Sequence, residues 1–148
     1  MDNPPEVTAL VPGPAIAIRG QVSLAQLPEF FAGALGELAA CGATHIAGPP
    51  MALYHSFDPA RIDVEIAMPV REAIPASGRI KPIALDGGPA VQVRHVGTYE
   101  QLGTAYQTIQ EWIEDHHRAT AGVVREVYLT PASAPAGERV TLVVQPLA

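Results

Sequence analysis

The chain has 148 residues, 48% of them hydrophobic and 16% charged, a composition typical of a folded globular protein rather than a disordered one. The net charge is −6, and the nine basic residues lack the clustering that binding to a nucleic-acid backbone requires. The sequence contains no run of 18 apolar residues, so we predict no membrane-spanning helix. From the charge and the hydropathy together we expect no direct contact with nucleic acid or with a membrane.

The N-terminal residues 1–6 are acidic and lack the basic and apolar regions of a signal peptide. Cys41 is the single cysteine, which excludes an internal disulfide and a cysteine cluster for zinc. We therefore expect a cytoplasmic protein that holds no metal and no cofactor.

The first half of the chain has one amphipathic helix among strands. Apolar residues recur at spacings of three and four over residues 24–41, after a capping-box signature that begins at Ser23. Gly42 is a plausible stop signal. The segments that we expect to be strands are 15–19, 51–57 and 62–70.

The second half repeats this organisation. A second amphipathic pattern covers residues 99–117, after a capping-box signature at Thr98, and Gly122 is the expected stop signal. Residues 86–89 have the composition of a tight turn between two strands. The expected strands are 79–85, 90–94, 123–130 and 140–147.

The two halves align with each other. Arg19 falls on Arg94 at an offset of 75 residues, and Tyr54 falls on Tyr128 at an offset of 74. We interpret this as a duplicated strand–helix–strand–strand unit in a single α+β domain, although two unrelated α+β halves remain an alternative. The expected repeats are about 7–75 and 78–147. They would be related by a pseudo-twofold axis, with antiparallel sheets and two helices flanking a central ligand groove.

One acid differs between the halves. Glu126 stands where the first half has Ala52, and it shares a strand face with Tyr128 because side chains alternate along a strand. An unpaired carboxylate is costly in a core. One interpretation therefore places Glu126 in the groove, with the two equivalent tyrosines as walls. The other is a solvated face or a salt bridge to Arg94 or Arg125.

A second acid, Glu65, lies opposite the apolar face of the strand at 62–70 and aligns with Leu142. It is either an exposed edge charge or a second acid of the groove. Aromatic faces beside one or two carboxylates suit a lipophilic cation. Trp112 lies beside the apolar stripe of the second helix, where packing at the helix flank is the simpler interpretation. The Gly-x-Ser-x-Gly motif and glycine-rich phosphate loops are absent from the sequence.

Several segments together resemble the GyrI-like small-molecule-binding domain, and the likeness covers about residues 7–147. The segments that carry it are 48–55, 63–70, 97–102, 105–106, 111–113, 125–129 and 141–146. The resemblance implies the duplicated architecture of the effector-sensing modules in AraC- and MerR-type multidrug regulators. Because these motifs fill the chain and leave no room for a helix-turn-helix, we expect a stand-alone binder of lipophilic cationic or aromatic molecules.

The family's pocket glutamate lies on a Glu-x-Tyr strand, which matches Glu126 and Tyr128 here. The resemblance therefore implies that Glu126 binds the ligand, with Tyr54 lining the facing half. The other residues that we expect at the ligand site are Glu65, Tyr99, Tyr106 and Trp112.

Two alternatives come from stand-alone relatives of this family. Some resemble hydrolases of strained, cyclopropane-type toxins; Glu126 would then be a general base on water, assisted by Tyr128 or Tyr54. Another relative binds DNA gyrase, which makes an inhibitory protein partner the third hypothesis. The sequence leaves open whether the protein is an enzyme.

Overall fold

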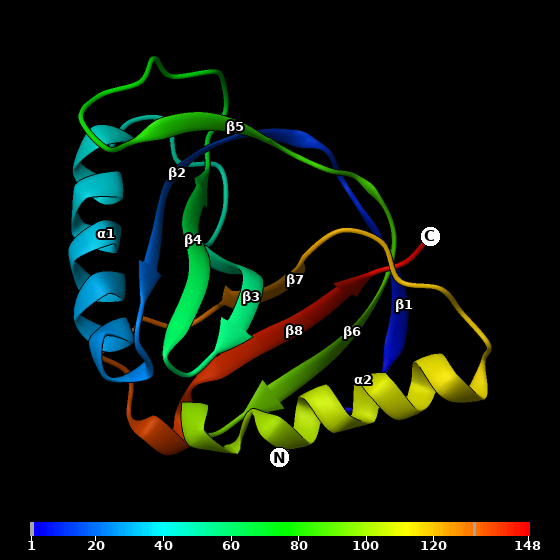
Figure 1. Cartoon of the computed structure of the whole chain (residues 1–148). Coiled ribbons are helices and arrows are strands. Elements are labelled where there is room, and N and C mark those ends of the chain that lie inside the picture. Colours follow the sequence, from blue (N-terminus) through cyan, green and yellow to red (C-terminus); the bar gives the residue numbers. More distant parts are fainter. Residues whose placement is uncertain (1, 132) are drawn as a thin grey trace. The chain divides into compact units, whose positions relative to one another are not determined.

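The computed structural model describes residues 2–131 and 133–148, which form two compact units. The N-half unit comprises residues 11–87, and the C-half unit comprises residues 88–148 together with residues 2–10. Each unit carries an antiparallel sheet and an α-helix (Figure 1). The predicted α+β class with antiparallel strands is therefore confirmed.

The N-half unit packs α1 against β2 and β4 of its sheet, whose strand order is β3-β4-β2-β5 (Figure 1). Its core includes the fully buried side chains of Ile16, Ile18 and Leu38. The elements are β2 (Gly13–Val22), η1 (Leu24–Gln26), α1 (Leu27–Cys41), β3 (Met51–Asp58), β4 (Arg61–Pro69) and β5 (Lys81–Leu85).

The C-half unit packs α2 against β6 and β8, and its strand order is β7-β8-β6-β1. One cluster of buried apolar side chains, among them Val93, Ile109 and Val143, joins the helix to the sheet. The elements are β1 (Glu6–Leu10), β6 (Gly88–Val96), η2 (Tyr99–Gln101), α2 (Gly103–Asp115), β7 (Val124–Tyr128), η3 (Ala136–Glu138) and β8 (Val140–Pro146).

The internal geometry of the two units matches residue by residue. In the N-half unit Tyr54 pairs with Val64 across β3 and β4, and in the C-half unit Tyr128 pairs with Thr141 across β7 and β8. Both pairs agree with the offsets of the sequence alignment. The two tyrosines therefore hold equivalent places in their own sheets.

The outer strand of each unit comes from an unexpected part of the chain. β5 pairs with β2, and β1, which the sequence patterns did not predict, pairs with β6. The predicted turn does join the strand that ends at Leu85 to the one that follows, but the two strands pair with different partners, so the segment 86–87 connects one unit to the other.

The predicted helix starts are half right. The Ser23 hydroxyl and the Gln26 side chain form the predicted capping box, but it opens η1, and α1 begins only at Leu27. The Thr98 side chain forms no capping bond in the part of the chain that the structure describes. A single turn of η2 therefore precedes α2, and Tyr99 lies on that turn rather than on the helix.

The predicted stop at Gly122 is wrong, whereas Gly42 does cap α1. Helix α2 ends at Asp115 because His117 adopts a left-handed conformation with φ of 51°. The Arg118 N–H then donates to the Ile113 carbonyl at 3.1 Å, which closes the helix end. Within the described residues, no helix is long and apolar enough to cross a membrane.

Candidate functional site

Glu126 is a buried acid in the middle of the C-half unit. Its side chain lies on β7 opposite Val143, a fully buried core residue, and only 8% of Glu126 is exposed. At the equivalent position of β3 the N-half unit has Ala52, which is fully buried. A carboxylate therefore occupies a core position at which the other unit has a small apolar side chain.

Two tyrosine hydroxyls hold this carboxylate. Tyr128 donates to Oε1 at 2.9 Å and Tyr106 donates to Oε2 at 2.5 Å, so each oxygen has its own donor. Tyr128 reaches Glu126 because residues two apart on a strand share a face, as the sequence predicted. Tyr106 comes from α2, which packs on that face. The structure thus brings together three of the predicted site residues.

Burial and these hydrogen bonds act in opposite directions on the acid. Burial raises the pKa of the Glu126 carboxyl above its ordinary value, and the hydroxyl donors of Tyr106 and Tyr128 moderate that rise. Once ionised, this carboxylate is therefore poorly hydrated, although two hydroxyl donors bond to it. Such a carboxylate gains from the approach of a positive charge.

Tyr99 adds an aromatic layer outside this group. Its ring meets the ring of Tyr128 edge-on, with centroids 5.8 Å apart, and the Arg139 guanidinium lies 4.9 Å from the Tyr99 centroid. Tyr99 is 37% exposed, whereas Glu126 is almost fully buried. We name Tyr99, Tyr106, Glu126 and Tyr128 the tyrosine–glutamate cluster.

Trp112 lies elsewhere on α2. It follows Tyr106 by six residues, which places it about 120° around the helix from that side chain. Its ring stacks on His116, with centroids 4.2 Å apart, and packs against the apolar core. These contacts match the interpretation of Trp112 as a packing residue and give no link to Glu126.

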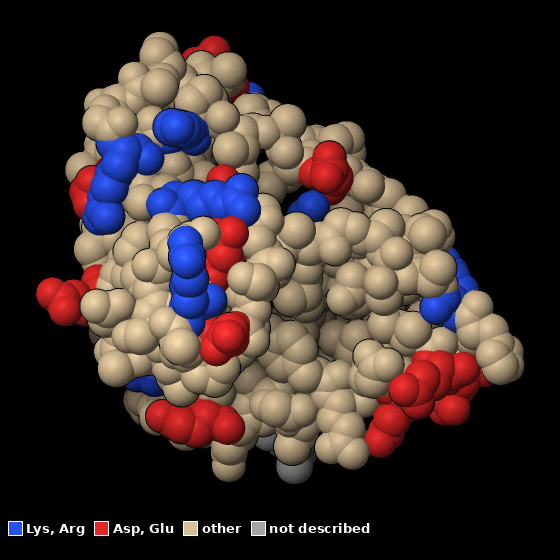
Figure 2. All heavy atoms as spheres, viewed as in Figure 1, with Lys and Arg blue, Asp and Glu red and all other residues tan. Residues whose placement is uncertain are grey.

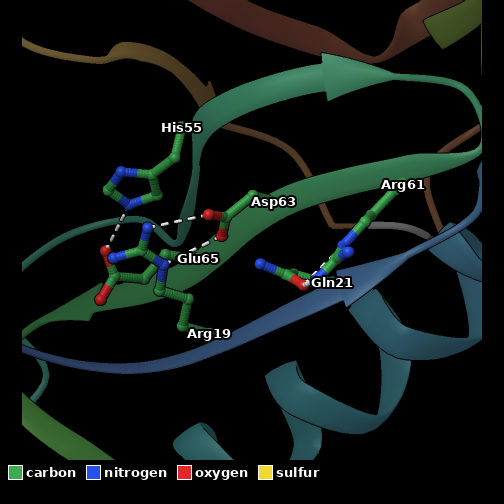
Figure 3. Close-up of polar contacts among 6 residues, drawn as sticks. All are labelled: Arg19, Gln21, His55, Arg61, Asp63 and Glu65. Carbon is green, nitrogen blue, oxygen red and sulfur yellow. Dashed lines mark hydrogen bonds and ion pairs between the residues drawn. The ribbon is translucent and has the colours of Figure 1, made fainter.

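Glu65 belongs to a polar group on the N-half unit (Figure 3). Its Oε1 lies 3.0 Å from Nε2 of His55, and its side chain is 14% exposed. Next to it, Arg19 donates two hydrogen bonds of 2.9 Å to the carboxylate of Asp63. That guanidinium holds the pKa of Asp63 below its usual range. Glu65 is therefore an acid whose neighbours on the sheet already include two basic side chains.

Tyr54 lies on the other face of the same sheet. It pairs with Val64, whose side chain points toward the buried core, whereas Glu65 pairs with Leu53 on the opposite face. The Tyr54 ring packs against Phe57, with centroids 5.7 Å apart. Tyr54 and Glu65 therefore cannot line the same side of the N-half sheet.

The sequence matches the GyrI-like small molecule binding domain over residues 4–147. The chain belongs to the GyrI-like family. A comparison with curated proteins finds no match for the sequence. The GyrI-like assignment agrees with the resemblance that the sequence motifs indicated.

Solved structures with the same fold share little sequence with this GyrI-like chain. The C-terminal domain of EcmrR is 20% identical with a TM-score of 0.86, covering 97% of this chain and 96% of that domain. A hydrolase from Listeria innocua is 15% identical with a TM-score of 0.74, covering 98% and 92%. SAV2435 bound to tetraphenylphosphonium is 11% identical with a TM-score of 0.70, covering 97% and 93%.

The GyrI-like chain spans 56% of the EcmrR chain in its complex with DNA, so the likeness is to one part of that protein. At these identities the comparisons establish the fold. They leave the ligand and the chemistry to be argued from the residues of this chain.

Sequence reasoning missed two residues near the cluster. His95 is 1% exposed and follows Val91 and Val93 on the buried face of β6. That alternation was a signal for a buried histidine. Arg139 directly follows η3, and no periodic pattern in the sequence predicts its contact with Tyr99.

The described residues contain no group of three or more histidine, cysteine, aspartate or glutamate side chains that could hold a metal ion. The chemistry available at the tyrosine–glutamate cluster is therefore that of a carboxylate, phenol hydroxyls and aromatic faces.

Proposed function

We propose that this GyrI-like protein binds lipophilic cations and aromatic molecules, with Glu126 as the charged centre of its site. One observation carries the proposal: a buried carboxylate in a core position, with a tyrosine hydroxyl on each oxygen. The ligand would be a small molecule rather than nucleic acid or a membrane, and we expect it to be met in the cytoplasm.

The charge argument favours a cation. A buried carboxylate lacks the hydration that it would have in water, so a positive charge beside it recovers electrostatic energy in a medium of low dielectric. A lipophilic cation loses little hydration on entry, and the faces of tyrosine rings attract it further, by about 0.5–2 kcal/mol for each contact.

The surface charge points in the same direction. Exposed acidic side chains gather on the C-terminal half of α2, where Figure 2 shows a red patch; they are Glu111, Glu114 and Asp115. With the net charge of −6, such a surface favours the approach of cations over anions. The similarity in fold to SAV2435, whose structure holds tetraphenylphosphonium, supplies a probe of this ligand class.

Isothermal titration with tetraphenylphosphonium tests the proposal. Glu126→Gln keeps the size of the side chain and removes its charge, so we expect affinity to fall at least about tenfold. Glu29→Gln, the same change at an exposed site of the N-half unit, is the matched control and should bind as the unchanged protein does. Equal affinity in all three proteins would overturn the assignment of Glu126.

The same titration decides the role of Glu65. If Glu65 contributes charge to the ligand site, Glu65→Gln also weakens binding. If it serves only the polar group with His55 and Arg19, affinity stays unchanged.

Hydrolysis of a strained electrophile is the second candidate. The raised pKa of the Glu126 carboxyl favours it, since a base is most effective when its pKa approaches the working pH. Glu126 would take a proton from water as the water oxygen bonds to the strained ring carbon. The electrons of the broken ring bond would pass to a conjugated oxygen, stabilised by the hydroxyl of Tyr128.

Mass spectrometry of a cyclopropane-bearing toxin, incubated with the protein and with Glu126→Gln, tests this hydrolysis. A product heavier by one water only with the unchanged protein supports hydrolysis, and unchanged toxin with both excludes it.

A further inference from the structure

His95 is a buried histidine with both ring nitrogens bonded. Its Nδ1 meets a carboxylate oxygen of Asp2, and its Nε2 lies 3.0 Å from the carbonyl oxygen of Thr98. An oxygen therefore lies against each ring nitrogen, and the ring is held from both sides.

Asp2 faces the ring as a carboxylate. Its second oxygen accepts a hydrogen bond of 2.7 Å from the hydroxyl of Thr104 at the start of α2. Burial alone would raise the pKa of Asp2, but the hydrogen bonds from Thr104 and His95 hold it below its usual range. Asp2 thus joins the N-terminal segment to β6 and α2 through one charged contact.

The other side of His95 leads to the tyrosine–glutamate cluster. The Thr98 carbonyl that accepts from His95 also accepts from the amide of Gln101, the bond that closes η2. The next residue after Thr98 is Tyr99, whose ring packs edge-on against Tyr128. The His95 ring therefore holds the turn that presents Tyr99.

A second connection runs across the sheet. His95 pairs with Thr141 on β8, and Thr141 pairs with Tyr128 on β7, so the three side chains form one row on one face. Thr141 is fully buried, and its hydroxyl has no partner among the described residues.

We propose that His95 is a positioning residue of the ligand site: held by Asp2, its doubly bonded ring keeps η2 and Tyr99 against Tyr128, so that the N-terminal segment sets ligand affinity. The effect on ligand affinity rests on the proposed function of the cluster, whereas the positioning of η2 is independent of that function.

The side chains around the ring are those of Asp2, Gln101 and Thr104, and Asp2 is the charged one among them. Replacing the ring or this carboxylate therefore removes the contact that joins the N-terminal segment to β6.

Hydrogen exchange without ligand tests the positioning. We compare the unchanged protein with His95→Gln and Asp2→Asn, and with His45→Gln as the matched control at an exposed histidine of the N-half unit. Exchange over residues 98–104 should quicken several-fold in the first two variants and stay unchanged in the control. Equal exchange in all four proteins overturns the inference.

Titration with tetraphenylphosphonium tests the effect on the ligand. His95→Gln and Asp2→Asn should each bind about 3–10-fold more weakly than the unchanged protein, and His45→Gln should bind as the unchanged protein does.

A lower melting temperature for His95→Gln with unchanged affinity and unchanged exchange over 98–104 would mean that His95 only stabilises the fold, and would overturn the inference. If the unchanged protein binds no tetraphenylphosphonium, the proposed cation function fails. Hydrogen exchange over 98–104 then still decides whether His95 positions η2.

Discussion

The Tyr128 hydroxyl donates to Glu126 Oε1 at 2.9 Å, although the two residues are only two positions apart on one strand. Side chains on a strand face stand side by side, so this contact is encoded locally by the Glu-x-Tyr sequence. The partner on the other oxygen, Tyr106, comes from a helix twenty residues earlier. The carboxylate therefore combines a local donor with one that depends on how α2 packs.

Cation binding should strengthen as pH rises through the pKa of Glu126. Because burial raises that pKa, the acid carries its proton at pH values where an exposed glutamate is already ionised. The neutral acid offers no charge to a cation. Titrations with tetraphenylphosphonium over acid to neutral pH should therefore show affinity rising well above pH 4.5, the ordinary value for this side chain. A rise completed at or below that ordinary value would contradict the burial argument.

The stability of Glu126→Gln, compared with that of the unchanged protein, should increase from acid to neutral pH. A carboxyl whose pKa is raised in the folded state favours folding below its unfolded pKa, and that stability is lost as pH rises through the folded pKa. The variant has no such loss. Thermal unfolding should show the melting temperature of Glu126→Gln, relative to the unchanged protein, increasing from acid to neutral pH. A difference that stays constant with pH would show that the carboxyl titrates normally.

Tyr106→Phe and Tyr128→Phe should each push the pKa of Glu126 further up, because each removes a hydroxyl that stabilises the ionised form. The increase in cation affinity that accompanies ionisation of Glu126 should then occur at higher pH. Each change should also cost about 0.5–1.5 kcal/mol of unfolding free energy, the usual net value of a hydrogen bond. Tyr54→Phe is the matched control: at the equivalent position its strand neighbour is Ala52, so the increase in cation affinity should stay at the same pH.

Much of the site could be predicted because it lies on strands. Alternation placed Glu126 beside Tyr128, and comparison of the halves singled out Glu126 against Ala52; the register of each sheet agrees with both. The contact with Tyr106 could not be predicted, since the sequence gives the apolar stripe of α2 but not which strand position each helix residue meets.

The errors at helix ends have a similar cause. Thr98 has the right residue type for a cap, yet its carbonyl bonds to His95, and a separate turn of η2 precedes α2. At the other end, the helix stop that the sequence predicted at Gly122 falls at His117, which has φ of 51°. Both ends are closed by hydrogen bonds between residues three to five positions apart, which residue type alone does not report.

Arg139→Gln should lower the unfolding free energy by about 0.5–1 kcal/mol through loss of the cation–π contact with Tyr99. Because Arg139 also contacts other groups, a double-mutant cycle with Tyr99→Leu isolates the pair. Denaturant unfolding of the four proteins measures the coupling. Strictly additive effects would show that the guanidinium does not interact with the ring.

Gly97→Ala should destabilise the C-half unit by about 1–3 kcal/mol. Gly97 has φ of +144°, and a Cβ there would lie 2.8 Å from Gln101 Oε1 and 3.3 Å from His95 Nε2. The substitution therefore strains the backbone and crowds the ring that holds η2. Gly103→Ala is the matched control. A Cβ at this position, the start of α2, would meet no atom within 4 Å, and alanine favours a helix. Denaturant unfolding should show a loss for Gly97→Ala and no loss or a gain for Gly103→Ala. Equal stability of both variants would mean that the segment between β6 and η2 rearranges at no cost, which would also argue against a fixed position for Tyr99.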